Sequence, residues 1–438
     1  MNEQSTITVG LSGRNNQCVA VVGGGLAGLV ASITAAKAGA SVTLYEGAKS
    51  LGGRALTTEN HGFYINMGPH ALYVGGAGLQ ILRELGVDPK GAMPELNGTT
   101  AIFENKKYPL PFNFKSILFS PFLGLRDKFE VLRFYSKLPK MDASEYRDIS
   151  QKAFVDALCS RPAARNFLNA MCRLGTYTNA PELLSAEVMI EQFRMGASGV
   201  LYLHKGWISM VNDLATIARD SGVTIVTGAK VKSVVQQSKG VAVSYGSASE
   251  ELYDACILCV APKSVAQLCQ KERELEDTFE PAVEVRAACL DLALSEWPDQ
   301  SATFALGMDE PSYFSLHSAT ADLAPPGGAL VQAALYLGPE EKAGSDTRAV
   351  LEALVSKMQP GWQSKTVHAI YRPQALVSYR LPVAGNGGLK GRPDTRIADN
   401  LYIAGDWVGD TGLLTDAAVA SAHKAAQQAV NALNLVPV

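Results

Sequence analysis

The stretch Cys18-Val-Ala-Val-Val-Gly-Gly-Gly-Leu-Ala-Gly28 carries the signal that decides the fold. An apolar run of buried-strand type leads directly into a G-x-G-x-x-G pattern at Gly23, Gly25 and Gly28. In such a pattern the first glycine permits a tight turn, the second lets the main chain approach a pyrophosphate, and the third lets helix and strand pack closely. The free N–H groups that begin the following helix also favour a phosphate at this point.

The residues that follow complete a strand–helix–strand unit. Leu29–Ala38 is rich in Ala, Val and Ile and predicts a helix, for which Gly39 is a natural stop. Ser41–Glu46 predicts a second strand, and Glu46 lies eighteen residues beyond Gly28. An acid in this place accepts hydrogen bonds from ribose hydroxyls, and its charge disfavours the 2′-phosphate of NADP. The unit therefore predicts a parallel sheet with covering helices and a nucleotide site.

Composition limits the classes of protein that fit. The chain has 438 residues, of which 47% are hydrophobic and 18% charged, and its formal net charge is −3. Such a chain buries a large core and lacks the basic surface of a nucleic-acid binder, so we expect no nucleic-acid partner. Its seven cysteines are sparse and odd in number, which favours free thiols and a cytoplasmic location. Met1–Gln17 is polar, so we expect no secretory signal there.

The pair Cys256-x-x-Cys259 invites a redox or zinc interpretation. However, it lies in the apolar run Ala255–Val260, which predicts a buried strand, and strand residues three apart face opposite ways. We therefore interpret both thiols as buried packing residues and expect no metal site.

Two further segments point to a specific cofactor chemistry. Leu51-Gly-Gly-Arg54 follows the second strand, and Leu401-Tyr-Ile-Ala-Gly-Asp406 predicts a late strand that ends in Gly-Asp. Gly412–Ala418 then leads into a predicted helix, Asp416–Leu433. A helix N-terminus beside a strand end makes a second cradle with a favourable dipole, suited to the ribityl chain and the electron-rich edge of a reduced flavin.

Together these motifs resemble the superfamily of FAD-dependent amine oxidases, carotenoid (phytoene) desaturases and protoporphyrinogen oxidases. The resemblance is strong over roughly residues 18–76 and 398–430 and weaker between them. It implies an FAD cofactor, and we expect it to be non-covalent because no cysteine or histidine lies in an obvious attachment motif.

The resemblance also implies which residues contact FAD. Those at the pyrophosphate are Gly23, Gly24, Gly25, Leu26, Ala27 and Gly28. Glu46 is expected at the adenosine ribose, Val231 at the adenine, and Gly53 and Arg54 at the phosphates and flavin. The remaining residues are Gly68, Pro69 and His70 near the isoalloxazine, Gly405 and Asp406 near the phosphate and ribityl region, and Leu414 and Thr415 near the pyrimidine.

Three residues are candidates for catalysis or for the wall of the active site. His70 could act as a base or contact the flavin, and its alternative is a turn residue bonded to the main chain. Tyr379 could line the substrate site or simply pack. Trp407 could shield the flavin or fill space between domains.

The same resemblance implies a flavin oxidoreductase that oxidises a small, largely apolar substrate by hydride transfer to flavin N5, in the manner of a desaturase or dehydrogenase. Amine oxidases of this group commonly place an aromatic residue where Leu414 stands, which favours the apolar substrate. The alternatives are an amine oxidase that produces an imine and hydrogen peroxide, and a non-catalytic FAD-binding protein. Oxygen and other electron acceptors both remain open, as does the oligomeric state.

Pro109–Leu125 is rich in phenylalanine, with Phe112, Phe114, Phe119 and Phe122. This segment could make peripheral contact with a membrane or open a tunnel for a lipid-like substrate. The alternative is a helical cap packed on the substrate domain. Lys115 and three prolines exclude a membrane-spanning helix here.

Helical patterns over about 100–200 and strand patterns over most of 224–372 alternate without a flexible linker. We therefore expect an α/β fold in which a doubly wound, Rossmann-like FAD-binding domain is interleaved with an α+β substrate domain. The expected FAD-binding domain comprises 1–100, 205–265 and 385–438. The expected substrate domain comprises 101–204 and 266–384, a helical insertion plus a mixed sheet.

Overall fold

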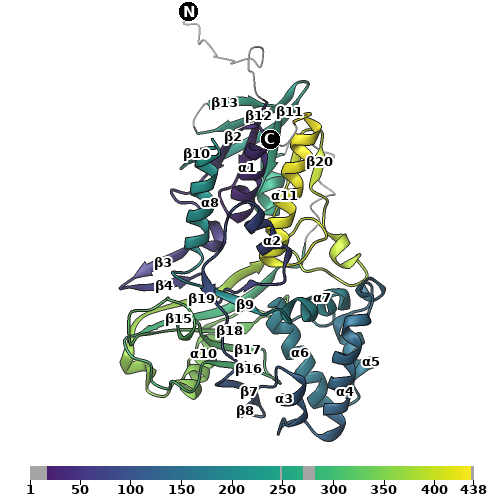
Figure 1. The fold of residues 1–438 in the computed structure, drawn as a ribbon, viewed down its shortest axis with the longest axis vertical. Helices are drawn as coiled ribbons and strands as arrows, with labels where there is room; N and C mark the ends of the chain where they lie inside the picture. Colours follow the sequence, from purple (N-terminus) through teal and green to yellow (C-terminus); the bar gives the residue numbers. More distant parts are fainter. Residues whose placement is uncertain (1–16, 247–248, 270–281, 436–438) are drawn as a thin grey trace, which may run out of the picture.

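Two large sheets organise the chain in the computed structural model, which describes residues 17–246, 249–269 and 282–435 (Figure 1). The expectation for the polar stretch Met1–Gln17 lies outside these residues except at Gln17. No helix among the described residues is long and apolar enough to cross a bilayer.

The first sheet has six strands in the order β10–β2–β1–β14–β21–β20. All neighbouring strands are parallel except the β20–β21 pair at one edge. The strands are β1 (Cys18–Val22), β2 (Ser41–Glu46), β10 (Thr224–Thr227), β14 (Ala255–Leu258), β20 (Arg396–Ala398) and β21 (Leu401–Ile403). The parallel sheet built around Cys18–Val22 confirms the α/β class that the opening motif predicts.

Three long helices cover one face of this sheet. They are α1 (Leu26–Lys37), α8 (Ile208–Asp220) and α11 (Leu414–Ala432), with α2 (Ala77–Glu84) packed on α11. The other face carries an antiparallel sheet of β11 (Val231–Gln237), β12 (Gly240–Tyr245) and β13 (Ser249–Tyr253), together with α9 (Pro262–Leu268). Side chains alternate between the two faces, so Cys256 and Cys259 pack on opposite sides as predicted, and all seven cysteines are free thiols.

The second sheet has seven strands in the order β19–β15–β18–β17–β16–β7–β8. Its neighbours are antiparallel except β16 and β7, which run parallel. The strands are β7 (Thr99–Phe103), β8 (Lys106–Pro109), β15 (Val285–Leu294), β16 (Phe304–Gly307), β17 (Ser312–Leu316), β18 (Ala329–Tyr336) and β19 (Thr366–Ser378). The sequence patterns indicated β15, β16, β18 and β19 but missed β7, β8 and β17. Strand β7 pairs with β16, which lies some 200 residues further along the chain.

One core of this second unit lies between the sheet and a group of helices, and α10 (Ser345–Met358) covers the other face. The helices are α3 (Phe114–Leu118), α4 (Leu125–Lys137), α5 (Gln151–Leu158), α6 (Pro162–Thr176) and α7 (Ala186–Gly196). These helices confirm the amphipathic patterns that begin at Arg126.

Short elements join the two units. They are the hairpin β3 (Thr57–Asn60) and β4 (Phe63–Asn66), the small sheet of β5 (Leu72–Tyr73), β6 (Gly91–Ala92) and β9 (Val200–Leu203), and several single 3₁₀ turns. The two-domain division stays a proposal. Its boundary near residue 100 falls inside β7, which belongs to the second sheet.

Candidate active site

The glycine turn after β1 combines two tightly packed glycines with one that faces open space. A Cβ on Gly23, where φ is +106°, would lie 2.5 Å from the Cys259 carbonyl oxygen, and one on Gly28 would lie 1.7 Å from the Gly23 carbonyl oxygen. Gly25 has an extended backbone, and its Cβ would meet nothing among the described residues closer than the Gly52 carbonyl oxygen at 3.9 Å. The protein thus leaves the space in front of Gly25 open, as a close approach to a ligand requires.

Helix α1 begins at this turn with nothing of its own to satisfy its first N–H groups. Gly25 is the N-cap without a side-chain cap, and no acidic residue lies in the first turn, which contains Leu26 and Ala27. Uncapped N–H groups together with the helix dipole favour a bound anion. The arrangement therefore suits the phosphate role expected of residues 23–28.

Glu46 braces the same turn from the end of β2. One carboxylate oxygen accepts from the Gly24 N–H at 2.6 Å, and the other accepts from the Ala48 N–H at 2.7 Å. Each oxygen keeps a second acceptor direction, so these bonds leave room for ribose hydroxyls. The Ala229 N–H donates to the Glu46 carbonyl at 2.9 Å, which brings the start of β11, and with it buried Val231, to this corner.

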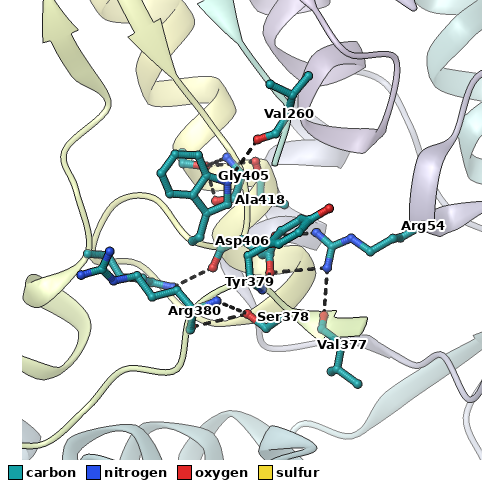
Figure 2. A network of polar contacts seen from close by, with 12 residues as sticks. Arg54, Val260, Val377, Ser378, Tyr379, Arg380, Gly405, Asp406 and Ala418 are labelled. Carbon is teal, nitrogen blue, oxygen red and sulfur yellow. Dashed lines mark hydrogen bonds and ion pairs between the residues drawn. The ribbon is translucent and has the colours of Figure 1, made fainter. Parts of the chain in front are cut away.

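The Gly-Gly-Arg segment joins the glycine turn after β1 to the C-terminal motif. The Gly52 N–H donates to the Gly24 carbonyl at 2.8 Å, so Gly53 follows directly beside the turn. The Arg54 side chain leads away from it and forms an ion pair with Asp406, while its Nη1 donates to the Val377 carbonyl at 2.9 Å (Figure 2).

Tyr379 completes this network. Its ring centroid lies 4.8 Å from the Arg54 guanidinium carbon, and its main-chain N–H donates to Asp406 Oδ2 at 3.0 Å (Figure 2). Asp406 is buried and follows Gly405, whose N–H donates to Ser421 Oγ at 3.0 Å. The structure thus brings together Arg54, Tyr379 and Asp406, which the sequence offered only as separate candidates.

Trp407 lies in the core rather than at an open surface. It is 1% exposed, and its indole Nε1 donates to the Val260 carbonyl at 3.3 Å. Through this bond the residue after Asp406 is fixed to the loop that follows β14. A pocket of about 590 Å³ opens beside Tyr379 and Trp407, and Lys263, Glu284, Arg286 and Arg380 are among its lining residues.

The Gly68–Pro69–His70 turn is held from below by the second sheet. Gly68 has φ of +92°, and its carbonyl accepts from Gln332 Nε2 at 2.8 Å. The same Gln332 Nε2 lies 3.5 Å from Asp291 Oδ1, and Asp291 forms a buried ion pair with Arg372. The Gly68 carbonyl is therefore bonded to a side chain of β18, which also contacts an ion pair between β15 and β19.

His70 is bonded back to its own turn. Its Nδ1 lies 2.9 Å from the Gly68 carbonyl oxygen. The ring meets Trp207 edge-on, with centroids 4.9 Å apart. Burial lowers the pKa of His70, so the imidazole is held neutral.

The start of α11 is strained in the way that ligand sites often are. Leu414 has φ of +52°, which is unfavourable for a residue with a Cβ, and the helix has no side-chain N-cap before Thr415. Arg392 is buried and holds this loop by donating to the carbonyls of Asp406 at 3.3 Å and Gly412 at 2.9 Å. Burial lowers the pKa of Arg392 to about 10.

On the side of the second sheet, tyrosine rings gather in the core. Tyr336 meets Tyr177 at 5.8 Å and Tyr313 at 6.4 Å between centroids, and the Tyr313 hydroxyl lies 3.0 Å from His317 Nε2. His317 stacks on Tyr202 at 3.8 Å. The buried Tyr336 hydroxyl finds no hydrogen-bond partner among the described residues.

Sequence reasoning missed Asp291, Gln332, Arg372 and Arg392. The usable signal for the first two was a single polar residue inside each of two apolar strands, VRAACLDLAL and ALVQAALY. Asp291 and Gln332 are direct cross-strand partners. Among the described residues, no group of three or more His, Cys, Asp or Glu side chains is placed to hold a metal ion.

Comparison with known proteins gives a family and a set of relatives. The family model described as flavin containing amine oxidoreductase matches residues 26–430. A curated relative, 4,4'-diaponeurosporene oxygenase from Staphylococcus aureus (strain USA300), is 27% identical over 312 residues. That match spans 60% of this chain and 61% of the relative, less than two thirds of its length.

Solved structures resemble nearly the whole chain. An oxidoreductase from Methanosarcina mazei gives a TM-score of 0.75 at 17% identity, over 94% of this chain and 100% of that one. Putrescine oxidase bound to putrescine gives 0.74 at 15% identity, over 95% and 99%. At these identities the likeness shows the fold alone.

Proposed function

This chain belongs to the flavin-containing amine oxidoreductase family, and from that premise we propose that it is an FAD-dependent dehydrogenase or desaturase of a small, largely apolar substrate. The observation that carries the substrate class is the aliphatic start of α11. Leu413 and Leu414 pack against the core of the second unit, where an aromatic wall would favour an amine. The match to an oxygenase named for diaponeurosporene supports the same choice.

The residues at the expected cofactor site fit a flavin dinucleotide. Gly25 faces open space, and α1 and α11 both begin without side-chain caps. The buried Arg392 Nε has no hydrogen-bond partner among the described residues, next to carbonyls of the loop 406–412. We propose that residues 23–28 hold the pyrophosphate, Glu46 and Val231 the adenosine end, Gly53 and Arg54 the region between, and Gly405, Asp406, Leu414 and Thr415 the flavin end.

When bound, the flavin supplies the two-electron acceptor for substrate oxidation. The chain's own residues supply binding and orientation. Gln332, which also contacts Asp291, fixes the Gly68 carbonyl at the start of the turn that holds Pro69 and His70. Because His70 is hydrogen-bonded to a main-chain carbonyl, the geometry supports a positioning role for this neutral imidazole. The role of a base is the alternative, and a pH profile of flavin reduction distinguishes the two.

A second candidate is an amine oxidase. The ring cluster of Tyr177, Tyr202, Tyr313 and Tyr336 favours it, because aromatic faces attract cationic nitrogen. Fold likeness to putrescine oxidase and to cyclohexylamine oxidase from Brevibacterium oxydans IH-35A is compatible with either candidate.

Two measurements test the proposal. An absorption spectrum taken before and after acid precipitation should show flavin bands that move to the supernatant, whereas bands in the pellet would mean a covalent link. Anaerobic bleaching of the flavin by apolar isoprenoids but not by amines supports the dehydrogenase. Bleaching by amines alone supports the oxidase, and bound FAD that no substrate reduces supports a non-catalytic protein.

A further inference from the structure

Exposed apolar side chains concentrate on α3 and α4. Of the eleven large apolar side chains exposed among the described residues, five lie within sixteen positions: Phe114, Leu118, Phe119, Leu125 and Phe129. Phe119 is 72% and Leu125 86% exposed. These five residues are here called the apolar tip. Helices α3 and α4, on or next to which they lie, are at the end of the molecule opposite the six-stranded sheet (Figure 1). The other six exposed apolar residues are scattered, which is ordinary for a protein surface.

The phenylalanine-rich segment divides into inward and outward side chains. Phe112 meets Phe304, and Phe122 meets Phe103, Tyr108 and Phe167, so these two rings belong to the core. Phe114 and Leu118 are four residues apart on α3, as are Leu125 and Phe129 on α4, so each pair shares one helix face. The packing cap and the exposed surface expected as alternatives are therefore both present, on opposite sides of one segment.

The charges around the apolar tip are basic. Lys115 and Arg126 are exposed next to residues of the tip in the chain. Arg133 and Lys137 are also exposed and follow Phe129 on the same face of α4, at spacings of four residues. Both acidic residues of α4 accept hydrogen bonds from main-chain N–H groups. Asp127 is buried and accepts from the Gly124 and Ala164 N–H groups, and Glu130 accepts from the Ser160 and Arg161 N–H groups. Cations thus form the exposed charge that borders the tip.

We propose that the apolar tip docks the protein on the surface of an anionic lipid bilayer. Apolar side chains bordered by Lys and Arg suit the boundary between acyl chains and negatively charged headgroups, where buried apolar area and charge attraction add. Charge complementarity selects the anionic bilayer over a neutral one. The proposal goes beyond the proposed function, because it holds whatever substrate the enzyme oxidises.

The test is flotation of the flavin-loaded protein with vesicles of phosphatidylcholine alone or with added phosphatidylglycerol. We expect flotation with the anionic vesicles, weaker binding to the neutral ones, and loss of binding at high salt. Phe119→Asp/Phe129→Asp should lower the partition coefficient by more than about tenfold. Lys115→Gln/Arg126→Gln, which keeps the apolar tip, should lower binding to anionic vesicles by about 25-fold, at roughly fivefold per charge.

The control is Met93→Asp/Leu96→Asp, which makes the same change at two exposed apolar residues outside the tip. It should float like the unaltered protein, and all variants should keep the same flavin content and rate of flavin reduction. Failure of the unaltered protein to float overturns the proposal, as does equal flotation of Phe119→Asp/Phe129→Asp. A dimer that this variant converts to a monomer also overturns it, since the occupant would then be a second copy. None of these outcomes bears on flavin reduction, so the proposed function stands or falls separately.

Discussion

Arg54 and Asp406 form an ion pair although 352 positions separate them in the chain. Asp406 is 2% exposed and its partner 39%, so a buried carboxylate is matched by an arginine that reaches it from the edge of the site. Tyr379 lies over the guanidinium and also donates its N–H to the carboxylate. The Gly-Gly-Arg segment and the C-terminal Gly-Asp motif, which flank the expected cofactor site, therefore stabilise each other. Weakening either one should destabilise both.

The first prediction concerns this pair. Arg54→Gln should lower the free energy of unfolding by about 2 kcal/mol, because it leaves a buried carboxylate with less compensation, and solvent at Arg54 keeps the cost below that of a fully buried pair. The double variant Arg54→Gln/Asp406→Asn should lose about 1 kcal/mol less free energy of unfolding than the sum of the two single-variant losses. Chemical denaturation measures both.

Arg348→Gln is the matched control, because Arg348 pairs with Glu352 at 2.8 Å and lies over Tyr371 on the surface. It should cost less than about 0.5 kcal/mol. Strict additivity of the Arg54 and Asp406 losses would show that the pair is not coupled.

The second prediction separates ligand contact from folding at the glycine turn. Gly25→Ala adds a methyl group that meets no described protein atom closer than 3.9 Å, so the thermal stability of the flavin-free protein should stay within about 1 °C. Flavin affinity should fall by about tenfold or more if the pyrophosphate approaches this Cα. Gly196→Ala on α7, where a Cβ meets nothing within 4 Å, should change neither quantity. Unaltered affinity in Gly25→Ala would place the pyrophosphate elsewhere.

The third prediction concerns His70. His70→Ala should leave FAD bound and slow the anaerobic reduction of the flavin by about tenfold, with an unchanged pH profile, because a positioning residue holds the turn without taking up a proton. A base would instead contribute about 10² to 10⁴-fold and a pKa in the profile. His368→Ala on β19 is the control and should reduce normally. Unchanged reduction in His70→Ala removes this residue from the mechanism.

The fourth prediction is a pH dependence carried by Asp416. Burial raises the pKa of this carboxyl to about 6, and its Oδ1 accepts from the Gly78 N–H at 2.7 Å. The unfolded chain has an ordinary aspartate pKa of about 3.9, so the folded state holds the proton more tightly between these values. The contribution of this proton to the free energy of unfolding is therefore fully present below about pH 4 and is lost as the pH rises through about 6.

Asp416→Asn keeps an oxygen acceptor for Gly78 but cannot ionise. Relative to the unaltered protein, it should gain about 2 to 3 kcal/mol of unfolding free energy between pH 4 and pH 7. Urea denaturation at several pH values gives this difference. A difference that stays constant across the range would contradict the assignment.

The sequence by itself determined the fold around the mainly parallel six-stranded sheet. Gly23, with φ of +106°, and Gly28, which has no room for a Cβ, are constrained by their near neighbours in the chain. The strand before them, the helix and the second strand all lie within about thirty residues. Local spacing can carry such information because the constraint acts between near neighbours in the chain. The buried strands and the amphipathic helices beyond Arg126 were predictable for the same reason.

Tertiary structure alone decided how the remaining residues meet. Asp291 and Gln332 were readable as polar residues in apolar strands, yet only strand pairing brings them together under Gly68. Composition marked 109–125 as rich in phenylalanine, but packing chose Phe112 and Phe122 for the core and left Phe114 and Phe119 outside. Such outcomes depend on which distant surfaces compete for each side chain, and spacing along a chain does not encode that competition.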